Sequence, residues 1–370
     1  MIGVNIIIFI IILALLVLAH EFGHFIVAKR FGVRVDEFGL GFPPRIIGKK
    51  IGETVYSVNA IPFGGFVRIF GENPNDTQTS DTQIDYDYKR NLARRSRWVQ
   101  AAVLAAGVTF NVIFAWFLIS AGFVLGFPVP VDSTNASMVS DTRVAISAVL
   151  SNSPAEQAGL KPGDIITALS TETAALTSGV TPTAIHDFIA GSSGSVTVDY
   201  KRGTKFLSKS ITPSETIVSG SRTIGISMDM VGIERLSLVT ALRDGSVVTW
   251  NLLQNVTTSI AGFIRDAVFG HPNLSNVAGP VGMVALVGDA RDLGFPYLIF
   301  FTALLSLNLA VINLIPFPAL DGGRLLILAI EAIKGSPLKP KLANAVNTAG
   351  FALLMILMLL VTYHDIVKLF

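Results

Sequence analysis

Two histidines four residues apart, with a glutamate beside the first, have the clearest chemical meaning in this chain. They lie in the run His20-Glu21-Phe-Gly-His24. On a helix, residues four apart share one face, so both imidazoles can bind one metal ion, while the glutamate can reach a water molecule on that metal. This is the HExxH pattern of zinc hydrolases. It predicts a hydrolytic Zn²⁺ centre with Glu21 as general base.

The composition places this motif in an apolar context. Of the 370 residues, 51% are hydrophobic and only 15% are charged, which is typical of a protein that crosses a membrane several times. Cys is absent, so a zinc site must use His and carboxylate ligands. No basic run indicates a nucleic-acid partner. The expected partner is the lipid bilayer.

Four stretches are apolar enough to span a bilayer, which takes about 20 residues. They cover residues 4–27, 98–127, 295–316 and 347–363. No basic residue precedes the first apolar run, so we do not expect a cleaved signal peptide there. His20 and His24 therefore lie in a predicted transmembrane helix.

Lys and Arg are concentrated between the first and second spans, and they recur between the third and fourth. The positive-inside rule places both segments in the cytoplasm, and the chain ends and the long central segment outside. Residues Asn5 to His20 correspond to about 22 Å of helix rise. In an apolar layer about 30 Å thick, the metal centre would then lie past the midplane, nearer the cytoplasm.

The segment between the second and third spans has two parts. Residues 129–232 are rich in Ser, Thr and Gly with short β-type runs, which predicts a small soluble domain. Residues 236–269 are amphipathic with a helical period. They predict either a helix in the membrane interface or one packed on the soluble domain. Residues 72–90 are polar and predict a mobile cytoplasmic loop.

Zinc needs a third protein ligand, and Asp321 is the candidate. It ends the apolar run of the third span, where a carboxylate is costly and marks a functional site by default. The predicted topology puts Asp321 on the same side as His20 and His24. No metal-binding role is expected for the three other histidines, which are His186, His271 and His364.

The chain resembles the site-2 protease family of intramembrane zinc metalloproteases, in its bacterial form. The main matches are HEFGH at 20–24 and NLIPFPALDGG at 313–323. Lesser motifs follow in family order at 38–44, 61–66, 106–111 and 278–282. The motif at 106–111 departs from the family pattern at Val108, which we interpret as affecting packing of the second span and leaving the metal site unchanged. The resemblance implies Zn²⁺ bound by His20, His24 and Asp321.

The resemblance also implies residues that hold the substrate. Residues 61–66 look like the family's membrane-re-entrant β-hairpin, so Gly64 and Gly65 are expected beside an extended substrate strand. Asn308 and Asn313 match family positions implicated in holding an unwound substrate. Their alternative role is hydrogen bonding between helices.

The soluble segment resembles a PDZ domain. Residues 153–164 show a turn pattern common in bacterial PDZ modules, and residues 222–226 resemble the carboxylate-binding loop of circularly permuted versions. Ile224, Gly225 and Ile226 would then bind substrate. Such a domain could exclude large substrates as a size filter, or it could read newly exposed C-termini.

Together these features predict a polytopic α-helical membrane protein with about four transmembrane helices, a re-entrant β-hairpin and an inserted extracytoplasmic PDZ domain. The expected boundaries are 1–128 for the first two spans and the hairpin, 129–232 for the PDZ domain, 233–294 for an amphipathic interfacial region, and 295–370 for the last two spans. The expected location is the bacterial inner (plasma) membrane. The expected substrates are single-span proteins already cut by a site-1 protease, such as anti-sigma factors, or remnant signal peptides.

Two other classes of function stay open. A membrane scaffold would bind peptides through its soluble domain and carry an incidental metal site, so chelators would leave its function unchanged. A transporter would use the intramembrane His and Asp side chains as an ion path. It would favour internal sequence symmetry, which we do not find in this chain.

Overall fold

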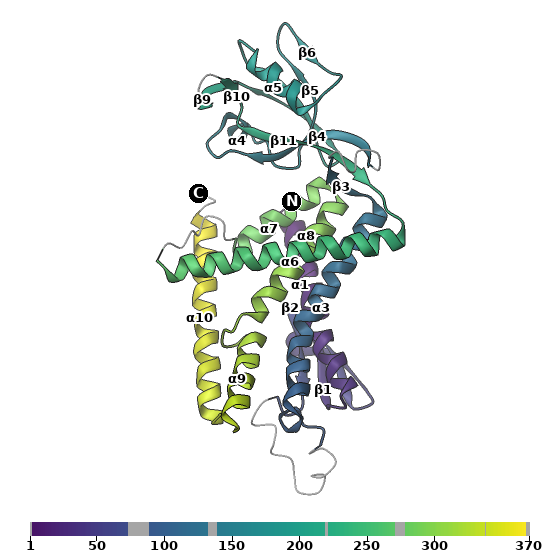
Figure 1. The fold of residues 1–370 in the computed structure, drawn as a ribbon, viewed down its shortest axis with the longest axis vertical. Coiled ribbons are helices and arrows are strands. Elements are labelled where there is room, and N and C mark those ends of the chain that lie inside the picture. Colours follow the sequence, from purple (N-terminus) through teal and green to yellow (C-terminus); the bar gives the residue numbers. More distant parts are fainter. Residues whose placement is uncertain are drawn as a thin grey trace. The chain divides into compact units, whose positions relative to one another are not determined.

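The structure is a computed structural model that describes residues 2–72, 89–131, 139–218, 221–270, 278–336 and 338–367 (Figure 1). The predicted polar loop at 72–90 lies outside these residues except at its ends, and His271 also lies outside them. The chain divides into two compact units. We name the unit of residues 1–119, 245–287 and 301–370 the helical unit, and that of residues 120–244 and 288–300 the β-rich unit.

The described helices are α1 (Ile2–Arg30), α3 (Arg97–Leu125), α4 (Pro154–Gln157), α5 (Pro182–Ala190), α6 (Leu238–Val268), α7 (Pro280–Leu293), α8 (Phe295–Leu314), α9 (Asp321–Lys334) and α10 (Pro340–Val367), with a 3₁₀ turn at Leu92–Arg94. Four of them, α1, α3, α8 and α10, are long and apolar enough to cross a membrane. They lie at the four places predicted from sequence. These helices agree with a multi-span membrane protein.

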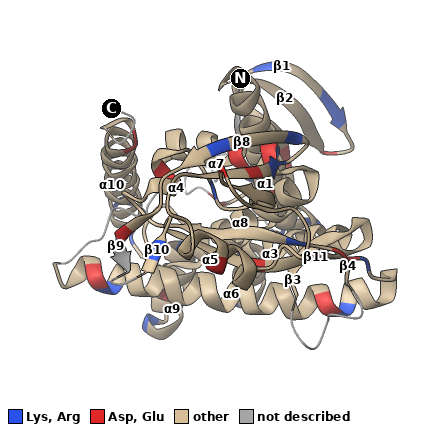
Figure 2. Cartoon of the chain, turned by 90° about the horizontal axis from the view of Figure 1, so that it is seen from above, with Lys and Arg blue, Asp and Glu red and all other residues tan. Residues whose placement is uncertain are grey.

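Helix α6 has 31 residues and is not among the candidate spans. Its charged residues, Arg243, Asp244, Arg265 and Asp266, lie near its two ends, as Figure 2 shows. Between them apolar and polar side chains alternate with a helical period, as expected from sequence. The amphipathic segment is thus one continuous helix, and its location in the membrane interface stays a prediction.

In the helical unit, β1 (Val35–Ile51) and β2 (Thr54–Ile69) form an antiparallel two-stranded sheet. The sheet follows shortly after the end of α1. Val35 and Ile69 pack with Ala28 of α1 and Val103 of α3 in a small apolar cluster. The segments 38–44 and 61–66 both lie inside this hairpin. Whether it enters the membrane stays a prediction.

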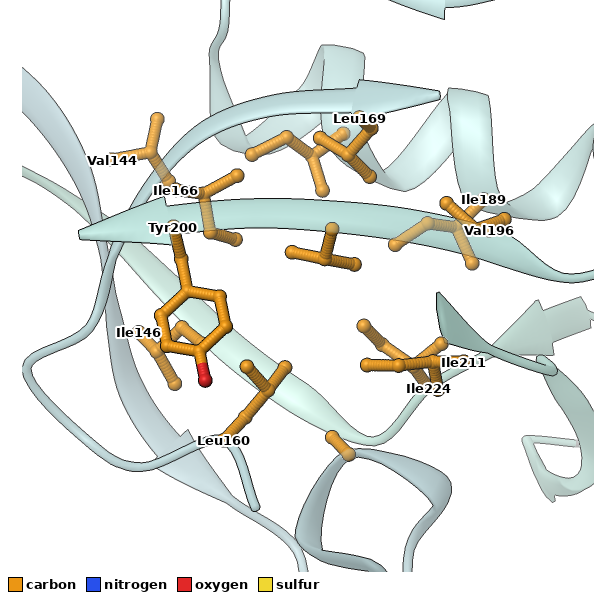
Figure 3. Packing of buried hydrophobic residues seen from close by; sticks show 13 residues of the cluster. Val144, Ile146, Leu160, Ile166, Leu169, Ile189, Val196, Tyr200, Ile211 and Ile224 are labelled. Carbon is orange, nitrogen blue, oxygen red and sulfur yellow. The ribbon is translucent and has the colours of Figure 1, made fainter. Parts of the chain in front are cut away.

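The β-rich unit contains a sheet with strand order β3-β11-β4-β5-β7-β8, in which β6 pairs with β5. The strands are β3 (Phe127–Pro130), β4 (Val139–Val149), β5 (Ile165–Ser170), β6 (Ala175–Leu176), β7 (Val196–Arg202), β8 (Lys205–Ile211) and β11 (Ile226–Glu234), with a separate pair β9 (Ser214–Val218) and β10 (Ser221–Thr223). Aliphatic side chains and Tyr200 fill its core (Figure 3). Ser153 and Thr181 cap α4 and α5 through their hydroxyl groups. The assignment of this unit as a PDZ domain stays a prediction.

Candidate metal centre

The side chains of His20, His24 and Asp321 converge inside the helical unit, and we name this group the metal centre. His20 and His24 lie one turn apart on α1 and are 8% and 7% exposed. Their Nε2 atoms are 3.2 Å apart. Asp321 Oδ2 lies 3.0 Å from His20 Nε2 and 3.3 Å from His24 Nε2. Within the described residues, this is the one group of His, Cys, Asp or Glu whose ligand atoms meet closely enough to hold a metal ion.

The spacing of these three atoms fits a tetrahedral zinc ion. Bonds of about 2.0–2.1 Å at tetrahedral angles place neighbouring ligand atoms about 3.3 Å apart. Asp321 Oδ2 is buried, and apart from its contacts with the two imidazoles it has no hydrogen-bond partner among the described residues, so it is available to bind a metal ion. Two histidines and one carboxylate are also a donor set of catalytic zinc sites, which leave the fourth position for water or substrate.

Asp321 reaches the metal centre because α9 begins at that residue, directly after a tight turn from α8. Two glycines make this close start possible. A Cβ atom on Gly322 would lie 2.3 Å from the carbonyl oxygens of Leu314 and Ile315, and one on Gly323 would lie 2.2 Å from that of Phe317. Any larger residue would push the first turn of α9 away from α8, and the carboxylate with it.

Helix α3 supplies the contacts behind both imidazoles. His24 Nδ1 lies 2.8 Å from the carbonyl oxygen of Val103, and His20 Nδ1 lies 3.2 Å from Nδ2 of Asn111. Between them, a Cβ on Gly107 would lie 2.4 Å from His24 Nε2 and 2.6 Å from His20 Cε1. Sequence reasoning linked the 106–111 motif only to packing and missed these contacts. The available signal was an Asn in an apolar span, which marks a functional position.

The metal centre opens into a cavity of about 210 Å³. Its polar wall includes Glu21, Glu72 and Arg324, and the last two form an ion pair with each other. Glu21 lines this cavity together with Val67 of β2. A carboxylate, a potential metal centre and space for several water molecules therefore share one cavity, which is what hydrolysis requires. Glu72 and Arg324 were not predicted from sequence.

The structure does not bring the predicted substrate residues into the wall of this cavity. Asn308 donates a hydrogen bond of 2.9 Å to Leu304 O of its own helix, and Asn313 is half-buried near the C-terminal end of α8. Gly64 and Gly65 are buried on β2, where a Cβ on Gly65 would lie 3.8 Å from Glu21 Cγ.

The residues proposed to bind a carboxylate, Ile224, Gly225 and Ile226, belong to the β-rich unit. Ile224 is buried in its core, while Gly225 has a φ of 81°. The roles of all these residues as substrate contacts stay predictions. Of the two described histidines outside the metal centre, His186 is exposed on α5 and His364 is half-buried near the end of α10.

Comparison with known proteins gives a consistent picture. The model of peptidase family M50 matches residues 8–357. The chain is 34% identical over 362 residues to "Putative zinc metalloprotease CPE1693" of Clostridium perfringens, covering 95% of each chain. It is 35% identical to "Putative zinc metalloprotease all3971" of Nostoc sp., covering 93% of this chain and 91% of the relative. It is 29% identical to "Regulator of sigma-W protease RasP" of Bacillus subtilis, covering 99% of each.

Proposed function

This chain belongs to peptidase family M50, and we propose that it cleaves peptide bonds within the membrane-spanning segments of other proteins. It is a zinc metalloendopeptidase and a multi-pass protein of the inner membrane. The observation that carries the proposal is the convergence of Asp321, at the start of α9, with His20 and His24, which lie on a helix apolar enough to span a bilayer. Membrane-embedded peptide is the substrate that such a location favours.

His20, His24 and Asp321 are the proposed zinc ligands, since their atoms have the spacing and chemistry of a catalytic zinc site. Bound Zn²⁺ would act as a Lewis acid on the scissile carbonyl and would lower the pKa of a water molecule. The surrounding helices limit access of bulk water, so the cavity beside the ligands must admit the water that hydrolysis consumes.

Glu21 is the proposed general base. Its carboxylate would accept a proton from the attacking water and deliver that proton to the nitrogen of the departing amine. Glu21 and Val67 of β2 line the same cavity, and a Cβ on Gly65 of β2 would lie 3.8 Å from Glu21 Cγ. The carboxylate is therefore near the strand along which an extended substrate would lie.

The β1–β2 hairpin is the proposed docking edge for the substrate. Among the described strands, β1 and β2 pair only with each other. Residues 37–40 of β1 are paired on both sides, with residues 65–68 and with residues 55–58 of β2, so residues 65–68 of β2 have a strand partner on one side and an edge open to a third strand on the other. The proximity of Gly65 to Glu21 would bring a strand on this edge to the cavity. Asn308 and Asn313 are proposed to pair with backbone groups that unwinding of a substrate helix would free.

The proposed substrates are single-span membrane proteins that a site-1 protease has already shortened outside the cell. The relative in Bacillus subtilis is named a regulator of sigma-W, which favours anti-sigma factors over remnant signal peptides. The β-rich unit, as a PDZ domain, would face outside and act as a filter or a reader. Deleting residues 129–232 should admit uncut substrates if it is a filter, and it should lower cleavage of cut substrates if it is a reader.

The absence of Cys makes the proposed topology testable. Glu172 is exposed in the β-rich unit. A cysteine introduced by Glu172→Cys should react with a membrane-impermeant maleimide in intact cells. Lys49 is exposed in the hairpin. A cysteine introduced by Lys49→Cys should react only after the membrane is permeabilised. The reverse labelling pattern would contradict a cytoplasmic metal centre.

The central experiment measures zinc content and cleavage of a model single-span substrate by the purified protein in detergent. We expect His20→Ala to lose both zinc and cleavage, and Glu21→Gln to retain one zinc per chain while losing cleavage. His186→Ala, on the exposed face of α5, is the matched control and should retain both. Full cleavage by Glu21→Gln would exclude Glu21 as the base, and zinc retained by His20→Ala would exclude the ligand assignment.

A further inference from the structure

We propose that Asn111 is a positioning residue of the metal centre, whose side-chain amide oxygen accepts a hydrogen bond from Nδ1–H of His20. This bond would hold the imidazole in the tautomer and orientation that present Nε2 to zinc. The inference rests on the proposed function, because it takes His20 as a zinc ligand. It adds a role for α3, from which no zinc ligand comes.

The contact is short, buried and isolated from solvent. Asn111 Nδ2 lies 3.2 Å from His20 Nδ1, and Asn111 is 0% exposed. The other end of the amide, Oδ1, has no hydrogen-bond partner among the described residues. The carbonyl oxygen of Asn111 accepts a hydrogen bond of 2.7 Å from Ser306 Oγ of α8, so the backbone that carries the amide is itself anchored.

The chemistry of zinc binding decides which end of the amide must face His20. An imidazole that binds a metal through Nε2 carries its proton on Nδ1, and that proton needs an acceptor. The amide nitrogen of Asn111 cannot accept it, whereas Oδ1 can. Half a turn about the Cβ–Cγ bond exchanges the two atoms without moving the rest of the side chain. In the zinc-bound enzyme the oxygen would therefore face His20.

The second histidine shows the same arrangement with a backbone acceptor. His24 Nδ1 lies 2.8 Å from Val103 O, also on α3. Val103, Gly107 and Asn111 are spaced by four residues and so form one stripe along the helix. The stripe supplies an acceptor for His24, open space for both imidazoles and the proposed acceptor for His20.

The alternative is that Asn111 only ties α3 to α1 as a polar contact between helices. Two substitutions separate these roles. Asn111→Leu has a similar shape but neither accepts nor donates, whereas Asn111→Asp keeps an acceptor and loses the amide donor. Thr109→Val is the matched control, because Thr109 is exposed on α3 and bonds to Ala105 O of its own helix.

The experiment measures zinc affinity by competition with a chromophoric chelator, the absorption spectrum of the Co²⁺-substituted protein, and the thermal midpoint of the zinc-free protein. We expect Asn111→Leu to weaken zinc binding by about 10–100-fold, the usual effect of losing such a partner, and to change the Co²⁺ spectrum. The zinc-free midpoint should stay at the wild-type value. Asn111→Asp should bind zinc within about threefold of wild type, or more tightly, because carboxylates commonly orient metal-bound histidines.

Three results would overturn the proposal. The first is an Asn111→Leu protein that binds zinc within about threefold of wild type, and the second is an equal loss of affinity in the Leu and Asp variants. The third is a fall in the thermal midpoint of the zinc-free Asn111→Leu protein that is large enough to account for its whole loss of zinc affinity. If Asn111→Leu does not fold, Asn111→Asp decides alone, since a folded Asp variant with more than about 10-fold weaker binding contradicts an acceptor role. A wild-type protein without zinc would refute the proposed function itself.

Discussion

Polar atoms meet at the centre of the helical unit, whereas aliphatic side chains fill the centre of the β-rich unit. His20, His24 and Asn111 are each buried, and their positions depend on a glycine that lets two helices approach. Leu169, Ile166 and their neighbours exclude water through close packing of apolar side chains (Figure 3). A buried polar cluster needs its partners, and an aliphatic core needs only close packing. The two units should therefore respond to different perturbations.

The largest expected effect comes from filling the space between the imidazoles. In Gly107→Val the new side chain would begin 2.4 Å from His24 Nε2 and 2.6 Å from His20 Cε1, so the imidazoles must move or α3 and α1 must separate. A shift of about 1 Å in a catalytic constellation costs about 100-fold in rate, and we expect at least that loss of cleavage together with loss of zinc. Cleavage assays and metal analysis of the purified variant check this.

Gly262→Ala provides the control for a helical glycine, because nothing lies within 4 Å of the added Cβ. It should leave zinc content and cleavage at wild-type levels. Zinc retained by Gly107→Val would mean that the close approach of α3 is not what shapes the metal centre.

Zinc removal should distinguish the units thermodynamically. A ligand that binds only the folded state at about 1,000 times its Kd stabilises that state by about 4 kcal/mol. The three Trp residues, Trp98, Trp116 and Trp250, all belong to the helical unit. We expect a chelator to lower the unfolding midpoint reported by Trp fluorescence, while hydrogen exchange in the strands of the β-rich unit stays unchanged. Equal destabilisation of both would show that they unfold together.

A cavity in the aliphatic core should give the opposite result. Leu169 is 0% exposed, and replacing a buried Leu by Ala costs about 2–5 kcal/mol. Leu169→Ala should speed hydrogen exchange in β5 and β7 without changing zinc content. Leu207→Ala, at a position 38% exposed on β8, should have little effect on either. Loss of zinc in Leu169→Ala would show coupling between the two centres.

The same contrast explains how much of the metal centre could be predicted from the sequence. The spacing of His20 and His24 and the lone carboxylate of Asp321 are local features of the sequence, and the positive-inside rule predicts that both lie on one side of the membrane. The contacts of Asn111 and Gly107 depend instead on which face of α3 meets α1. An apolar span carries little periodicity to indicate that face, because lipid and neighbouring helices favour similar side chains.

The amphipathic helix was predicted from the sequence more accurately than the β-hairpin, because only the helix has a periodic pattern that fixes its structure locally. The amphipathic segment predicted at 236–269 is the helix Leu238–Val268, because a polar face against an apolar face fixes the period. The hairpin was expected around residues 61–66, which lie within β2 alone, and its first strand, β1, extends from Val35 to Ile51. That strand contains Gly39, Gly41 and two consecutive prolines, which are typical of turns. Pairing with β2 outweighs these local preferences.

The smallest expected effect concerns an ion pair at the surface of the helical unit, outside both centres. Glu53, in the turn between β1 and β2, contacts Arg90 at 2.6 Å and Lys29 at 2.5 Å. The hydrogen bond from Arg90 outweighs the effect of burial and, with Lys29, lowers the pKa of Glu53 from 4.5 to about 2. A lowered carboxyl pKa stabilises the folded state above the unfolded pKa, and that contribution is lost as pH falls towards about 2.

Glu53→Gln should therefore unfold at a lower temperature than wild type at about pH 6, by an amount corresponding to about 1 kcal/mol or less for a partly exposed pair. The difference between the two proteins should shrink steadily between about pH 5 and about pH 2, because the wild-type carboxylate becomes protonated in both states. Trp fluorescence measures the midpoints, and zinc content near neutral pH should be unchanged. A constant difference at all pH values would assign the effect of Glu53 to packing of the turn instead of its charge. A loss of zinc near neutral pH would mean that the hairpin, and not α3, sets the geometry of the metal centre.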